Sequence, residues 1–134
     1  MATVVVDNSV AGVWLYPGQA TAYTERLLEG LVESTVHTAF IWPAEFANAA
    51  SAMVKRDILT DDRGSEIVRI AETFGFVVDR TPADLSRLYQ ISRRHGLSVY
   101  DAAYLELAMR LEMPLATRDP ALATANQTLD LYVQ

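Results

Sequence analysis

Short β-branched runs alternate with helical segments along most of this 134-residue chain, and this alternation constrains the fold more than any other feature. The run Thr3–Val6 lacks polar–apolar alternation, which is typical of a strand buried on both faces of a parallel sheet. Further strands are predicted at 36–41, 76–78, 115–118 and 129–133. Because helices separate the strands, we expect an α/β fold, a three-layer α/β/α sandwich around a mostly parallel sheet of about five strands.

Two of the predicted helices begin at capping boxes, in which a hydroxyl side chain and an acid three residues later satisfy the first backbone donors. The segment Thr81–Asp84 combines such a box with a proline in the first turn and predicts a helix with Leu85 facing inward. The segment Ser98–Asp101 is the second box. Other helices are predicted near 9–15, 20–31, 43–57, 61–74 and 121–126.

Length and composition limit the class of protein. At 134 residues the chain is expected to be a single domain, 1–134. It has no cysteine, no signal-peptide pattern and no apolar run long enough to cross a bilayer, so we expect a cytoplasmic protein without a membrane contact. The net charge of −6 argues against binding nucleic acid by bulk electrostatics, but it allows a site whose carboxylates are neutralised by metal ions.

Four acids occupy related places in the predicted fold. Asp7 and Asp119 directly follow predicted strands, whereas Glu45 and Asp101 lie in the first turns of predicted helices. Both kinds of position lie at the carboxyl edge of a parallel sheet, where such folds bind ligands. The four side chains are therefore expected to converge on one crevice.

Each acid also has a structural explanation when it is taken alone. Asp7 and Asp119 can cap the helices that follow them, Glu45 suits the positive end of a helix dipole, and Asp101 completes a capping box. These alternatives stay open for every single residue. Four caps that share one edge are nevertheless a less economical explanation than one site.

The chemistry of such a site follows from its charges. Carboxylates that are brought close together repel one another unless a cation lies between them. Oxygen ligands suit Mg²⁺ or Mn²⁺, and two such ions would balance the charge of four carboxylates. Paired ions of this kind activate water and stabilise the leaving oxygen in phosphodiester hydrolysis. The residues therefore indicate metal-dependent phosphate chemistry.

Other phosphate enzymes fit the sequence less well. The chain has no Gly-Lys-Ser/Thr phosphate loop and no Gly-x-Ser-x-Gly nucleophile motif. A haloacid-dehalogenase phosphatase requires Asp-x-Asp after its first strand, whereas Asp7 is followed by Asn8 and Ser9. A response-regulator receiver requires a lysine near its acids, and the lone Lys55 ends a predicted helix far from the proposed edge.

The four acidic segments resemble, in order, the motifs of PIN-domain ribonucleases, most closely the VapC-type toxins of toxin–antitoxin pairs. The matching segments span nearly the whole chain: Val4–Val10, Trp42–Ala49, Leu97–Tyr104 and Leu115–Asp119. The similarity is most specific in the last two.

This resemblance implies an endoribonuclease dependent on Mg²⁺ or Mn²⁺. The metal ligands and catalytic residues that it implies are Asp7, Glu45, Asp101 and Asp119, with hydroxyl support from Ser9 and Thr117. It also implies an RNA substrate, a homodimer and a cognate antitoxin that blocks the active site.

Two alternatives to this full assignment remain open. Pro120 departs from the family pattern and removes a backbone donor beside the last acid, which predicts a looser ligand there. The whole chain can also be a catalytically silent PIN-like module that binds RNA or protein.

Overall fold

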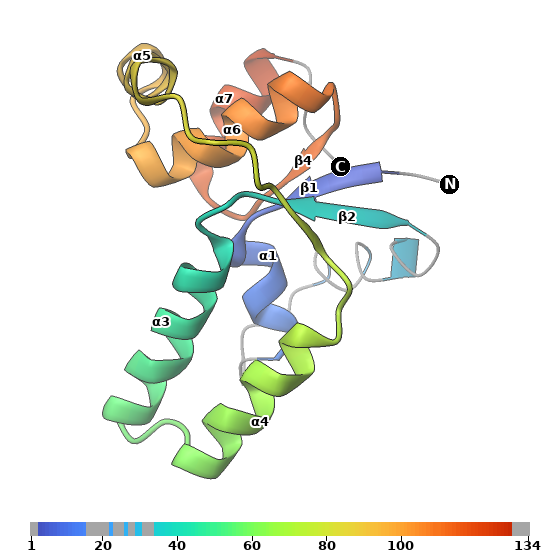
Figure 1. Cartoon of the computed structure of the whole chain (residues 1–134), viewed down its shortest axis with the longest axis vertical. Coiled ribbons are helices and arrows are strands. Elements are labelled where there is room, and N and C mark those ends of the chain that lie inside the picture. Colours follow the sequence, from blue (N-terminus) through green and yellow to red (C-terminus); the bar gives the residue numbers. More distant parts are fainter. Residues whose placement is uncertain (1–2, 16–21, 23–25, 27–28, 31–33, 130–134) are drawn as a thin grey trace.

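The computed structural model describes residues 3–15, 22, 26, 29–30 and 34–129. In chain order the elements are β1 (Thr3–Val6), α1 (Asn8–Ala11), the 3-10 helix η1 (Gly12–Trp14), β2 (Thr35–Thr38), α3 (Trp42–Lys55), α4 (Asp61–Glu72), β3 (Val77–Val78), α5 (Leu85–His95), α6 (Val99–Leu111), β4 (Leu115–Ala116) and α7 (Pro120–Thr128). The sheet lies between two helical layers, with α1, α3 and α4 on one face and α5, α6 and α7 on the other (Figure 1). The expected three-layer α/β/α architecture is confirmed.

The four described strands pair in the order β3-β2-β1-β4, and every pair is parallel. In the central pairings Val4 lies opposite Val36, and Val5 lies opposite Leu115. These side chains are buried, as the continuous apolar runs predicted. The fifth predicted strand, 129–133, lies outside the described residues except for Leu129, which closes α7 as its C-cap.

The strand order places a topological switch point between β1 and β4. From β1 the chain moves outward to β2 and β3, and it then returns to the opposite side of β1 to form β4. In open parallel sheets the crevice beyond the carboxyl ends of the strands at such a point is the usual ligand site. The residues that follow these two strands, 7–9 and 117–119, therefore lie side by side at that edge.

Helix α6 is the most deeply buried helix of its layer. Its six buried residues are Ala102, Ala103, Tyr104, Leu105, Leu107 and Ala108, which cover more than one face. It packs against α5 and α7 as well as β1 and β4, so apolar contacts surround it. The N-cap Ser98 accepts a hydrogen bond from the backbone N–H of Asp101 at 3.0 Å, as the capping box predicted.

The predicted start of α5 was wrong. Its N-cap is Asp84, whose carboxylate accepts from the backbone N–H of Arg87 at 3.1 Å. Thr81 instead donates its backbone N–H to Asp79 and accepts from Arg110 of α6. The helix thus begins three residues later than predicted, and Leu85 is 81% exposed instead of facing inward.

The remaining predicted helices differ from the structure mainly at their ends. The segment 9–15 forms two short pieces, α1 and η1. The segment 20–31 lies largely outside the described residues, although residues 22, 26, 29 and 30 are helical. No helix in the described ranges has both the length and the apolar character needed to cross a membrane.

Gly64 brings α3 and α4 into close contact. A Cβ atom at this position would lie 2.8 Å from Cγ2 of Val54, which is closer than real Cβ atoms come to a neighbour. Val54 is β-branched and has few alternative rotamers within a helix. The absence of a side chain at Gly64 therefore sets how closely the two helices approach.

We predict that Gly64→Ala lowers the free energy of unfolding by about 1 kcal/mol, because the overlap with Val54 exceeds the ~1 kcal/mol gain in helix propensity. Val54→Ala should consequently cost less stability in the Gly64→Ala background than in the wild type. Urea unfolding of the four proteins measures both effects. The exposed Ser65→Ala on the same helix should change stability by less than about 0.5 kcal/mol. A Gly64→Ala variant more stable than the wild type would contradict this account.

Candidate active site

Asp7 is a carboxylate buried at the carboxyl end of the central strand β1, where only 4% of its surface is exposed. Its Oδ1 accepts from Ser9 Oγ at 2.6 Å and from the backbone N–H of Val10 at 3.3 Å, and its Oδ2 accepts from Thr117 Oγ1 at 2.5 Å. Burial raises the pKa of Asp7 to about 6, although these hydrogen bonds favour the charged form. The desolvation of this carboxylate is therefore only partly compensated by the protein.

Ser9 and Thr117 connect Asp7 to the segment that follows β4. Ser9 Oγ accepts from the backbone N–H of Arg118 at 2.8 Å, and Thr117 Oγ1 accepts from the backbone N–H of Asp119 at 3.0 Å. Each hydroxyl thus receives one bond from that segment and donates its own proton to Asp7. These contacts fix the first and the last of the four acidic segments relative to each other.

Glu45 lies in the first turn of α3, in the helical layer opposite to that of α6, which carries Asp101 (Figure 1). It is half-buried, and its Oε1 accepts from the hydroxyl of Tyr104 on α6 at 2.5 Å. Burial raises the pKa of Glu45, the Tyr104 bond opposes this shift, and the charge of Asp101 adds to it. Burial and the Glu45 carboxylate raise the pKa of Tyr104 far above its ordinary value, so the hydroxyl remains a donor.

Asp101 links the four acids electrostatically. Burial and the charge of Asp119 raise the pKa of Asp101, against the effect of Ser98. The charge of Asp101 in turn raises the pKa of both Asp7 and Glu45. Asp7, Glu45 and Asp119 therefore each lie within electrostatic reach of Asp101, at the edge where the strand order predicts a ligand site.

The structure also answers whether these acids cap helices. Asp7 is the N-cap of α1, and Asp119 is the N-cap of α7, where it accepts from the backbone N–H of Leu122 at 2.9 Å. Capping and membership of the acidic group thus occur together in the same side chains. Pro120 occupies the first position of α7, where a backbone N–H has no helical partner. It therefore costs Asp119 no hydrogen bond that the helix would otherwise supply.

The donor set suits a hard divalent cation. The available ligands are carboxylate oxygens, which Mg²⁺ and Mn²⁺ prefer, and burial together with their mutual repulsion raises the pKa of Asp7, Glu45 and Asp101. Within the described ranges, no three acidic or histidine side chains are already gathered as a metal-binding cluster. The acids are thus neighbours rather than a preformed cage, and their assignment as metal ligands stays a prediction.

Comparisons with known proteins agree with this arrangement. The family model of the PIN domain matches residues 4–126. Ribonuclease VapC3 of Pyrobaculum aerophilum is 30% identical over 121 residues, which cover 89% of this chain and 91% of that protein. The chain belongs to the PIN-domain family, among the VapC-type ribonucleases. The resemblance seen in the sequence is confirmed.

Solved structures of other proteins share the fold. PAE2754 from P. aerophilum superposes with a TM-score of 0.73 at 19% identity, covering 94% of this chain and 81% of that one. VapC20 of Mycobacterium tuberculosis, a toxin that cleaves the sarcin-ricin loop, superposes with a TM-score of 0.68 at 18% identity, covering 91% and 94%. At these identities the likeness establishes the fold alone.

Two residues that contact this PIN site were not predicted from the sequence. Tyr104 was placed only at the end of the third matching segment, and Thr38 only in a strand. A buried tyrosine needs a hydrogen-bond partner for its hydroxyl, and Asp101 one turn earlier indicated that Tyr104 lies near the acids, but it did not indicate Glu45 as the partner. For Thr38 the local sequence carried no such signal, because its contact with the Val6 carbonyl depends on strand pairing.

We predict that the metal-free protein becomes more stable as the pH falls from 7.5 to 5. The folded pKa of Asp7, about 6, lies above its ordinary value of 3.8, so the folded state binds more protons between these values and its stability is lost as the pH rises. Raised pKa values at Glu45 and Asp101 act in the same direction. Asp79 does not contribute in this pH range: its Arg110 bond outweighs burial and lowers its pKa below 3.8, so it is ionised in both the folded and the unfolded state.

Urea unfolding in EDTA at the two pH values measures this dependence. Asp7→Asn should remove much of it and raise the stability at pH 7.5 by about 2 kcal/mol. Asp84→Asn makes the same chemical change at an exposed helix cap and should leave the pH dependence unchanged. Wild-type stability that increases steadily from pH 5 to 7.5 would contradict the prediction.

Proposed function

We propose that this protein is a metal-dependent endoribonuclease and the toxin of a toxin–antitoxin pair. The observation that carries the proposal is the electrostatic coupling of Asp101 with Asp7, Glu45 and Asp119 at the switch point of the sheet. Neighbouring carboxylates of raised pKa supply oxygen ligands for divalent ions, and such ions suit phosphodiester hydrolysis. The ribonuclease name of VapC3 and the toxin activity of VapC20 support the assignment.

The residues of the chain would have distinct parts in this reaction. Asp7, Glu45, Asp101 and Asp119 would hold Mg²⁺ or Mn²⁺. When bound, the ions would supply an activated water and charge stabilisation at the leaving oxygen. Ser9 and Thr117 donate their hydroxyl protons to Asp7, so we propose that they orient this carboxylate and do not contact RNA.

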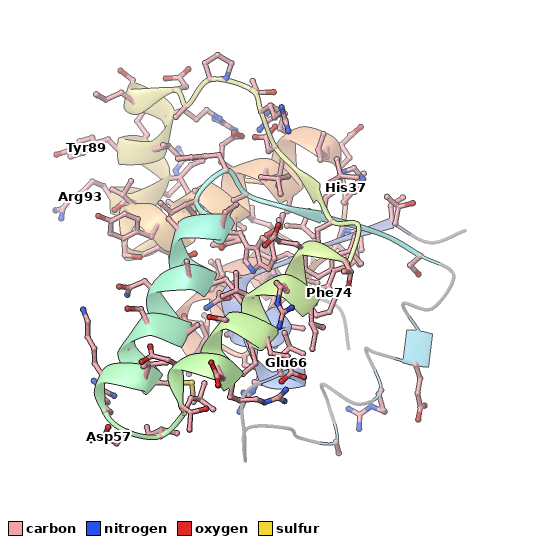
Figure 2. The ribbon with its side chains drawn as sticks, turned by 60° about the horizontal axis from the view of Figure 1, so that its bottom comes forward. His37, Asp57, Glu66, Phe74, Tyr89 and Arg93 are labelled. Atoms are coloured by element: carbon pink, nitrogen blue, oxygen red, sulfur yellow. The ribbon has the colours of Figure 1, made fainter. Side chains whose placement is uncertain are left out.

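RNA would have to approach an acidic protein through local positive charge. Arg118 is exposed beside the site, and Ser9 fixes its backbone. The last turn of α5 carries Arg93, Arg94 and His95, and neither arginine forms a salt bridge within the described ranges. Figure 2 shows Tyr89 and Arg93 projecting outward from α5. These side chains are the proposed contacts for RNA phosphates and bases.

The remaining assignments follow from the same proposal. The protein would act in the cytoplasm as a homodimer of single-domain subunits, 1–134, and a cognate antitoxin would block its acidic site. One observation favours a silent RNA-binding module as the alternative: among the described residues the acids do not form a ready-made cluster. Metal-dependent RNA binding without cleavage would support that alternative.

We predict that the purified protein cleaves single-stranded RNA in the presence of Mn²⁺ and that EDTA abolishes the cleavage. Asp7→Asn and Asp101→Asn should each reduce the rate at least about 100-fold, because each removes a charged ligand while keeping the shape of the side chain. Gel analysis of a labelled RNA measures this, with Asp84→Asn as the matched control. Cleavage that survives both substitutions or EDTA would refute the nuclease assignment.

Expression in a bacterium tests the toxin assignment separately. The wild type should arrest growth, and Asp101→Asn should not, at matched protein levels. Arrest by both proteins would mean that growth inhibition does not depend on the acidic site.

Two substitutions at Asp119 separate its capping from its proposed metal role. Asn caps helices as well as Asp does, so Asp119→Asn should change stability by less than about 0.5 kcal/mol, whereas Asp119→Ala should cost about 1 kcal/mol. Both should reduce cleavage to a similar extent, because both remove the charge. Chemical unfolding and the cleavage assay give the two readouts. If Asp119→Asn retained full cleavage, Asp119 would be a cap alone.

A further inference from the structure

We infer that Tyr104 is a positioning residue of the acidic site: its hydroxyl holds Oε1 of Glu45, fixes that carboxylate relative to Asp101, and leaves Oε2 as the oxygen that meets a divalent cation. The inference rests on the proposed function, since it describes how the chain prepares Glu45 as a ligand. It concerns a residue that acts through Glu45 and does not itself touch metal or RNA.

The contact joins the two helical layers. Glu45 belongs to α3 and Tyr104 to α6, and these helices lie on opposite faces of the sheet (Figure 1). The 2.5 Å hydrogen bond therefore spans the end of the sheet, beside the buried carboxylate of Asp7. Because Tyr104 stands one turn after Asp101 on the same helix, the bond also fixes the spacing between the second and third acids.

A second contact connects Tyr104 to the end of β1. The Thr38 side chain lies close enough to the Tyr104 hydroxyl to oppose the rise in its pKa, and Thr38 Oγ1 donates to the carbonyl of Val6 at 2.9 Å. Val6 directly precedes Asp7 in the chain. Thr38 is fully buried and Tyr104 is 1% exposed, so packing holds both in one place. One buried chain of side chains thus runs from Glu45 to the backbone beside Asp7.

The hydrogen bond from Tyr104 determines which oxygen of Glu45 is open to a cation. Its Oε1 is occupied by a donor on a rigid aromatic ring, and the side chain cannot rotate without breaking that bond. Of its two oxygens, Oε2 is the one that has both lone pairs open to a cation. Outer groups that orient a ligand typically change metal affinity by about 10- to 100-fold when they are removed.

The substitution Tyr104→Phe tests the inference because it removes the hydroxyl and keeps the buried ring. Isothermal titration of the metal-free variant with Mn²⁺, without RNA, should give a dissociation constant about tenfold above that of the wild type. In the cleavage assay the Mn²⁺ concentration for half-maximal rate should rise by the same factor. At saturating Mn²⁺, kcat and the KM for RNA should return to wild-type values.

Tyr100→Phe is the matched control. Tyr100 is 61% exposed in the first turn of the same helix, next to Asp101, and the substitution makes the same chemical change. It should leave Mn²⁺ affinity unchanged. A similar loss in both variants would overturn a specific role for Tyr104.

Two further variants test whether Tyr104 acts through Glu45. In a Glu45→Gln background, Tyr104→Phe should cause no additional loss of Mn²⁺ affinity, and a further tenfold loss would overturn the inference. Thr38→Val, which keeps the shape of a strand residue, should weaken Mn²⁺ binding about threefold by loosening the support of Tyr104. If Tyr104→Phe lowered thermal stability but bound Mn²⁺ like the wild type, its role would be structural and the inference would be wrong.

The failure of the proposed function gives a different result. In that case the wild type itself would not cleave RNA, whatever residue stands at position 104. Wild-type activity together with unchanged Mn²⁺ binding in Tyr104→Phe would reject the positioning role alone.

Discussion

The structure depends most on accommodating one buried charge, the carboxylate of Asp7 at the end of the central strand. Removing a carboxylate from water costs several kcal/mol unless donors replace the lost solvent. The chain supplies donors from Ser9 and Val10 just beyond it and from Thr117, which lies more than a hundred residues away. Thr117 can reach Asp7 only because β4 pairs with β1, so the strand order and the solvation of Asp7 are one requirement.

The same geometry explains why helix caps and site acids coincide. In a parallel sheet, the residue that leaves a strand is close to the start of the next helix, where free backbone N–H groups favour an acid. Asp7 and Asp119 each accept from such a donor with Oδ1, and Oδ2 of Asp7 accepts from Thr117 instead. Each of these acids can therefore be both a helix cap and a site residue. The cap fixes the carboxylate, and the sheet edge decides what the remaining oxygen faces.

The helices and strands, the parallel sheet and the four acids could be predicted from the sequence, because each depends on local patterns or on a family motif. The prediction misplaced the start of α5, because the neighbouring Asp79 accepts the Thr81 backbone N–H and the distant Arg110 donates to the Thr81 hydroxyl, so Thr81 does not cap the helix. Leu85 is consequently the first residue of α5, and it is 81% exposed, whereas Leu88 and Ile91 on the same helix are buried. The Tyr104–Glu45 bond was invisible for a similar reason: the two residues are 59 positions apart, and nothing local to either one specifies the partner.

Asp101 and Glu45 come from the two helical layers, and the fold fixes their positions by different means. Helix α6 is surrounded by apolar contacts on several sides, so packing of the core sets where Asp101 stands. Helix α3 buries only Trp42, Phe46 and Ala50, and Glu45 has a longer side chain with one more rotatable bond than an aspartate. Packing alone does not fix the position of the carboxylate at the end of such a side chain, whereas a directional hydrogen bond from the rigid helix α6 does. The hydrogen bond from Tyr104 on the well-packed helix α6 therefore fixes the Glu45 carboxylate on α3. The positions of Asp101 and Glu45 thus both depend on α6.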